Sequence, residues 1–168
     1  TTLDRARFPA EVLIVRGDLQ RLNSPAALSP AEVTGLEGRI QSALTGLAWL
    51  AQEYGALTKS KIDGQLLQDL AQSWAQRDFL SAQALADQLS NGYTLNSAIF
   101  SADRASAKDV ERARELDLQL CQGCHTDRVG AEKILPAYRL KEMAAGMPSD
   151  EFLARLLSGV RGTSDTAL

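Results

Sequence analysis

The sequence is poor in the residues that most often build chemical sites. Its 168 residues include two cysteines, one histidine, two methionines and two tryptophans, and 5% are aromatic. Two cysteines exclude a disulfide-rich scaffold, and one histidine excludes any metal site that needs several imidazoles. No apolar run approaches the roughly 20 residues of a membrane span. These absences leave few residues that can carry a chemical function.

The composition that remains is that of a globular protein. Apolar residues make up 45% of the chain and charged residues 23%, which is too apolar for a disordered chain. The length suffices for one sizeable core or two small ones. The net charge is −3, from 18 basic and 21 acidic residues. A net acidic chain without a basic block argues against a nucleic-acid partner.

Both cysteines and the only histidine fall within one string, Cys121-Gln122-Gly123-Cys124-His125. Two thiols at this spacing reach the two vinyl groups of one porphyrin and form thioethers. The adjacent imidazole then lies below the iron as the proximal ligand. The string therefore predicts one covalent haem c, held by Cys121 and Cys124 and ligated by His125.

Two other interpretations of the string stay open. The cysteines can form a redox dithiol or a disulfide, although a thioredoxin-type motif belongs in a βαβ unit and the flanks here look helical. They can also bind zinc together with His125. The fourth zinc ligand is then a carboxylate, because the chain has no other cysteine or histidine.

The predicted haem also indicates a compartment. Thioether attachment takes place outside the cytoplasm, which in bacteria means the periplasm. The chain begins Thr1-Thr2-Leu3-Asp4, without the basic and apolar segments of an export signal. We therefore expect a mature periplasmic protein from which the signal peptide has been removed.

Helical periodicity dominates the first half of the chain. It predicts four amphipathic helices, at about 9–23, 30–54, 60–77 and 78–90, joined by short connections. Pro9 suits the first turn of its helix, and Ser29 with Glu32 forms a capping box. Trp49 and Trp74 are expected in the core. Residues 1–91 are thus expected to form an up-and-down helical bundle.

The pattern breaks at residues 92–106, which we expect to be a linker. Ser106 then caps a helix that leads straight into Cys121. A short helix at about 137–145 and a last helix capped by Ser149 follow. The last helix has these apolar residues: Phe152, Leu153, Leu156, Leu157 and Val160. The fold class is therefore all-α, with a helical bundle followed by a haem region at 107–168.

Residues 107–168 resemble a class I cytochrome c domain. In that family a helix runs into C-x-x-C-H, a proline stretch follows, and a later helix ends at a glycine-bearing turn. Here Leu135-Pro136-Ala137-Tyr138 is similar to the proline stretch, and 152–162 is similar to the later helix and turn.

The resemblance implies roles for residues beyond the string. The Pro136 carbonyl would accept a hydrogen bond from Nδ1–H of His125 and fix its tautomer. Tyr138 would contribute to haem binding at the propionates. Further candidates at the propionates are Arg128, Lys133 and Arg139.

The family's methionine ligand and C-terminal helix have no counterpart before Leu168. Only Met143 and Met147 exist, 18 and 22 residues after His125, closer than the family pattern places its ligand. Either is a candidate distal ligand. We expect that the cytochrome domain is truncated. Alternatively the bundle covers the haem, or the sixth position is open.

These patterns predict an electron-transfer protein that is not itself an enzyme, because its only histidine is committed to iron. The electron-accepting part of an oxidoreductase is the alternative. Its partner would be a dehydrogenase, an oxidase or another cytochrome, oriented by residues 1–91. The alternative is a haem-based gas sensor or haem enzyme with an open sixth position. Cytochromes c′, four-helix bundles with such a site, are the alternative fold, although 43 residues follow His125 here.

Overall fold

The computed structural model describes residues 1–100, 102–123, 125 and 140–159. This part of the chain is helical and has no strand, which confirms the all-α prediction. The elements are α1 (Thr2–Leu22), α2 (Pro30–Thr58), α3 (Gly64–Ala75), α4 (Phe79–Gly92), the 3₁₀ turns η1 (Ser97–Phe100) and η2 (Ala102–Arg104), α5 (Ala107–Leu116), the π-helical turn η3 (Asp117–Cys121), α6 (Leu140–Gly146) and α7 (Ser149–Ser158).

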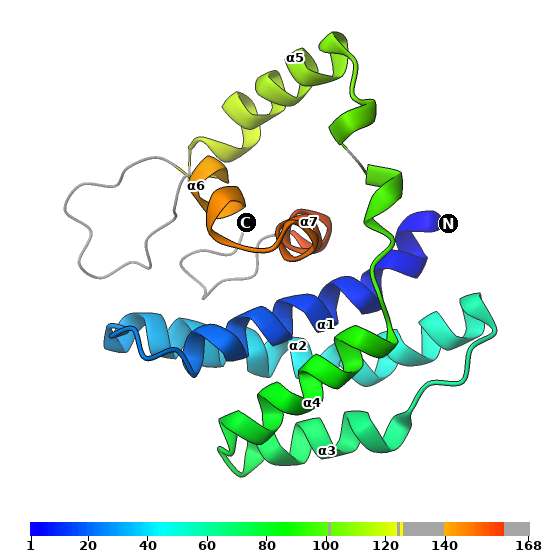
Figure 1. The fold of residues 1–168 in the computed structure, drawn as a ribbon, viewed down its shortest axis with the longest axis vertical. Helices are drawn as coiled ribbons and strands as arrows, with labels where there is room; N and C mark the ends of the chain where they lie inside the picture. The colour runs from blue at the N-terminus through cyan, green and yellow to red at the C-terminus, as the bar shows by residue number, and fades with distance from the viewer. Residues whose placement is uncertain (101, 124, 126–139, 160–168) are drawn as a thin grey trace.

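Helices α1 to α4 form the expected bundle, in which consecutive helices run in opposite directions (Figure 1). α1 packs against both α2 and α4, and α3 packs against α4. Their apolar faces meet in one core with these buried residues: Phe8, Val12, Val15, Leu19, Ile40, Ala43, Leu47, Leu50, Ala51, Leu70, Ala82, Ala86 and Leu89. The spacing of these residues is the helical period that the sequence displays.

Helix α1 begins seven residues earlier than the sequence predicts. Its N-cap is Thr1, whose side chain accepts a hydrogen bond from the backbone N–H of Asp4. Pro9, expected in the first turn, lies inside the helix and is buried. A proline inside a helix removes one backbone hydrogen bond, and here the burial of α1 on two sides outweighs that loss.

Two other boundaries of the bundle also differ. α2 continues to Thr58 and ends at Lys59, which adopts a left-handed conformation with φ of 58°. α3 starts at Gly64 instead of residue 60, because Asp63 caps it by accepting from the Leu66 N–H. The Ser29 capping box of α2 is confirmed.

Trp49, which the sequence places in the core, is 55% exposed. The guanidinium of Arg7 lies 5.9 Å from its ring centroid, a cation–π contact at the surface. Trp74 is half-buried against Phe79, and its Nε1–H donates to Gln41 Oε1 at 2.8 Å. The core prediction was therefore wrong for Trp49, because its spacing on α2 falls outside the buried stripe.

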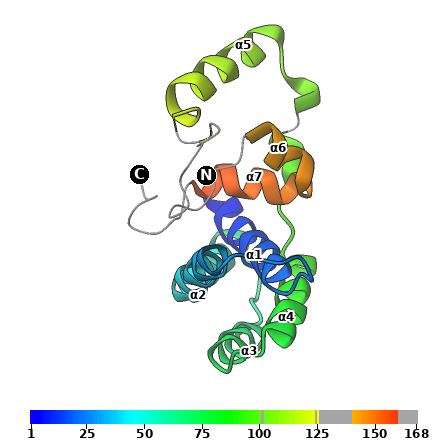
Figure 2. The ribbon, with the colours of Figure 1, turned by 90° about the vertical axis from the view of Figure 1, so that its left-hand side faces the viewer.

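A second, smaller core lies on the opposite side of α1. Ala10, Leu13 and Ile14 pack there against Ala154 of α7. Both views show α7 lying over α1 and crossing it, with α5 farther from the bundle (Figures 1 and 2). α1 is thus covered on two sides, which explains why its apolar residues run consecutively instead of forming one stripe.

Helix α7 differs from its predicted form. Pro148, not Ser149, occupies its N-cap position, without a side-chain capping bond. The buried residues are Glu151 and Ala154, while Leu156 is 54% exposed. The predicted apolar face is wrong in this respect, because the residues that meet α1 lie on the adjacent side of the helix. Val160 lies outside the described residues.

The close crossing of α1 and α7 predicts a strict size limit at Gly17. A Cβ atom there would overlap the Glu151 carboxylate. We expect Gly17→Ala to lower the free energy of unfolding by about 1–3 kcal/mol through overpacking, measured by urea denaturation. Gly46→Ala on α2 is the control, because its Cβ would meet open space. It should raise stability by about 0.5–1 kcal/mol through helix propensity. Equal effects at both positions would contradict the close approach.

Candidate haem-attachment segment

The C-x-x-C-H string follows a helix that starts where the sequence predicts. Ser106 and Asp109 form a capping box at the start of α5. Hydrogen bonds from the Ser106 hydroxyl, and then from its backbone N–H, lower the pKa of Asp109. The carboxylate therefore stays ionised at the positive end of the helix dipole. This cap fixes the end of α5 opposite the cysteines.

The helix does not reach Cys121 in regular α geometry. The five residues Asp117–Cys121 form the π-helical turn η3. The backbone N–H of Gln122 donates to the Asp117 carbonyl at 2.9 Å, five residues back. Gln122 Nε2 also donates to Asp117 Oδ2 at 2.9 Å. Two parallel hydrogen bonds thus close the wide turn that carries Cys121.

One backbone hydrogen bond of α-helical span follows within the string itself. The backbone N–H of His125 donates to the Cys121 carbonyl at 2.9 Å, four residues back. Cys121 and His125 are both half-buried, and Cys121 carries a free thiol. The first cysteine and the histidine therefore lie one turn apart, as thioether attachment beside the proximal ligand requires.

Large apolar side chains precede the string and stay exposed. The exposed fractions are 45% for Val110, 39% for Leu116, 63% for Leu118 and 67% for Leu120. No residue of α5 or η3 is buried. In the described part of the chain, this is the segment where large exposed apolar residues are most concentrated. These exposed side chains are candidates for contact with a ligand or a partner.

The remaining predicted site residues divide into two groups. Met143 lies in α6 and Met147 lies between α6 and α7, both half-buried. These positions leave both as candidate distal ligands. The rest lie outside the described residues: Cys124, Pro136 and Tyr138, and also Arg128, Lys133 and Arg139. Their roles stay predictions.

A buried charged cluster, which the sequence patterns did not predict, joins α7 to the bundle. Asp18 accepts hydrogen bonds from Arg39 Nε and Nη2 at 3.0 and 2.7 Å, and from Arg155 Nη2 at 2.7 Å. Glu151 accepts from Arg21 Nη2 at 2.8 Å and from Arg155 Nε and Nη2 at 3.0 and 2.7 Å. Two buried carboxylates therefore hold three guanidinium groups from α1, α2 and α7.

The charge balance of this cluster keeps Arg155 ionised. Burial lowers the pKa of the Arg155 guanidinium, but the charges and hydrogen bonds of Asp18 and Glu151 outweigh that effect and raise it overall. The sequence offers one signal for the cluster. Asp18 stands one helical turn after the buried Ile14, where a lone charge is costly unless a partner meets it.

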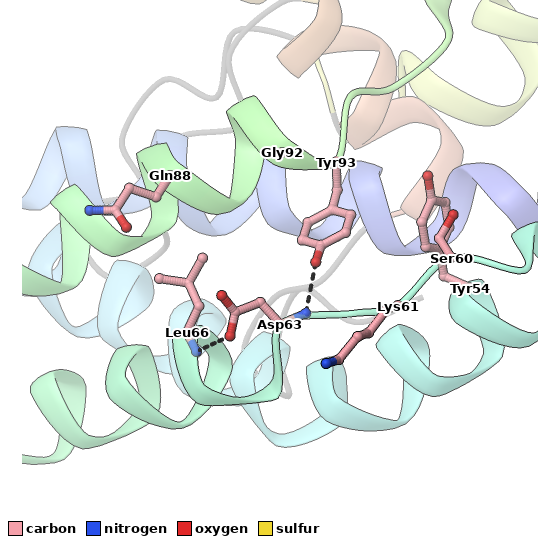
Figure 3. Close-up of a pocket in the computed structure, with 8 residues that line it drawn as sticks. All are labelled: Tyr54, Ser60, Lys61, Asp63, Leu66, Gln88, Gly92 and Tyr93. Carbon is pink, nitrogen blue, oxygen red and sulfur yellow. Dashed lines mark hydrogen bonds between the residues drawn. The ribbon is translucent and has the colours of Figure 1, made fainter.

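A separate polar cavity of about 430 Å³ lies at the end of the bundle (Figure 3). The backbone N–H of Asp63 donates to the Tyr93 hydroxyl at 2.8 Å, and the Asp63 carboxylate caps α3. These bonds join the α2–α3 connection to α4. Lys61, Ser60 and Gln88 also line the cavity. The bonded groups in this cavity serve the fold and do not converge on one point.

Comparison of the chain with known protein families, with curated proteins and with solved structures finds no match. Within the described ranges, no three His, Cys, Asp or Glu side chains gather as they would around a metal ion. No described helix has the length and apolar character to cross a membrane. The functional assignment therefore depends on the C-x-x-C-H string and its surroundings.

The charged cluster predicts that Arg155 contributes strongly to stability. Arg155→Ala should lower the free energy of unfolding by about 2–4 kcal/mol, because it leaves Asp18 and Glu151 buried with fewer partners. Arg112→Ala on α5 is the control, since Arg112 makes an exposed ion pair with Glu115. It should cost less than about 0.5 kcal/mol. Urea denaturation monitored by circular dichroism measures the free energy of unfolding of both variants. Equal losses of stability in Arg155→Ala and Arg112→Ala would contradict the stabilising role of the cluster.

Proposed function

We propose that this protein is a mono-haem c-type cytochrome that transfers electrons. Cys121 and Cys124 would hold one haem by thioether bonds, and His125 would be the proximal iron ligand. The observation that carries the proposal is the C-x-x-C-H string at the end of a helix whose large apolar side chains are exposed. The bound haem would supply a one-electron iron couple.

The residues around the string fit an apolar macrocycle. A porphyrin attached at Cys121 would lie beside the exposed side chain of Leu116, whose burial is favourable by about 1.5–3 kcal/mol if it is fully covered. The hydrogen bond from the His125 N–H to the Cys121 carbonyl sets the imidazole one turn from the first thiol. The apolar side chains would exclude water from the haem face, which tunes its potential.

The charged cluster supports a structural role for the bundle in haem binding. α7 follows the string in sequence. Arg21 of the bundle donates to Glu151 of α7, and Asp18, which Arg39 also contacts, accepts from Arg155 of α7. The bundle would therefore be the base on which the segment after the string is fixed. The bundle would also orient a redox partner. A dehydrogenase, an oxidase or another cytochrome is a suitable partner. Such a protein would act in the periplasm.

Haem attachment is directly testable. Expression in the periplasm together with cytochrome c maturation proteins should give an intact mass increased by one haem and a c-type reduced spectrum. Cys121→Ala with Cys124→Ala should abolish the covalent haem, because both thioether positions are lost. Ser97→Ala, outside the string, is the control and should retain it. A wild-type chain without haem under these conditions, or zinc bound in its place, would overturn the proposal.

The sixth iron position decides between electron transfer and gas sensing. Met147 is half-buried one residue before the N-cap of α7. We expect Met147→Leu to lower the midpoint potential and to open the reduced iron to carbon monoxide, because a methionine ligand raises the potential. Met143→Leu is the matched control. Rapid carbon monoxide binding to the wild-type protein would instead favour the open-site, cytochrome c′-like alternative.

A further inference from the structure

We propose that Asp117 is a positioning residue for the attached haem, because it holds the π-helical turn that sets the direction of Cys121 and His125. This inference rests on the proposed haem function. Its structural basis is the pair of hydrogen bonds between Asp117 and Gln122, one through the backbone and one through the side chains.

The side-chain bond is specific to the wide turn. In a regular α-helix, residues five apart point about 140° away from each other around the axis. A π-helical turn brings them to the same side, since its hydrogen bonds span five residues. The bond from Gln122 Nε2 to Asp117 Oδ2, at 2.9 Å, therefore stabilises the π geometry against the α geometry.

The turn changes which residue continues the apolar stripe of α5. In a regular helix, Ala113 and Leu116 would be followed on the same side by Leu120. One additional residue in the turn rotates all later positions by about 100°, so that Cys121 takes that place. The first thiol thus lies in line with Leu116.

The histidine is subject to the same shift. The His125 N–H donates to the Cys121 carbonyl four residues back, which places the His125 backbone one turn beyond Cys121. Without the wide turn, both residues would rotate away from the stripe. Asp117 therefore acts through Gln122 to align Cys121 with the apolar side chain of Leu116.

The test compares four variants. Asp117→Ala removes the side-chain acceptor, and Asp117→Asn keeps one through its amide oxygen. Asp117→Ala with Leu118 deleted shortens the segment by one residue, so that a regular α-helix restores the direction of Cys121. Glu111→Ala removes an exposed carboxylate of α5 and is the control. The readouts are haem yield from intact mass, Soret circular dichroism, midpoint potential and the trans-hydrogen-bond NMR coupling between Gln122 nitrogen and Asp117 carbonyl carbon.

We expect similar haem yields for all four variants, since the thioether residues are intact. Asp117→Ala should lose the NMR coupling, weaken the Soret circular dichroism and shift the midpoint potential. Asp117→Asn should behave as the wild type, and deletion of Leu118 should restore the Soret signal that Asp117→Ala weakens. An unchanged coupling and Soret signal in Asp117→Ala, or failure of the deletion to restore the signal, would overturn the role of Asp117.

The same data distinguish this inference from the proposed function. If the wild-type chain takes up no haem, the proposed function fails, and with it the role of Asp117 toward haem. The NMR coupling in the haem-free chain then reports on the turn alone. If the wild-type chain carries haem and Asp117→Ala matches it in every readout, the proposed function stands and the positioning role of Asp117 is wrong.

Discussion

The buried charged cluster between α1, α2 and α7 is the constraint on which the arrangement of the molecule depends. Asp18 and Glu151 are almost fully buried, and burying an unpaired carboxylate costs several kcal/mol. Their charges are therefore stable only where guanidinium groups meet them. Arg155 contacts both carboxylates, so α7 fits α1 at one place and in one orientation. Gly17 permits that approach, because any larger side chain would overlap Glu151.

The two sides of the C-x-x-C-H string are held very differently. After the string, α7 is fixed to the bundle by hydrogen-bonded charges and by the small apolar core around Ala154. Before the string, α5 and η3 bury no residue. One end is anchored and the other offers uncovered apolar surface, and the only histidine lies between them. A covalent haem would complete this arrangement, because it would cover apolar side chains that α5 leaves exposed.

Local signals predicted much of the secondary structure. The capping boxes at Ser29 and Ser106 start their helices at the predicted residues, because a capping bond involves only neighbours in sequence. Predictions that depend on distant contacts were less successful. The start of α1 was wrong, since burial of Pro9 from two sides outweighs its preference for a first turn. The predicted core position of Trp49 was wrong as well. The helical pattern of apolar residues did not predict the wide turn after Leu116.

The sequence by itself determined the helical class, the bundle and the grouping of Cys121, Cys124 and His125, because helical periods and ligand spacing are properties of neighbouring residues. The tertiary structure alone decided that α1 is covered on two sides and that Glu151 faces Asp18. The physical reason is the same in both cases. Charge pairing and close helix crossing depend on groups that are brought together only when the chain has folded.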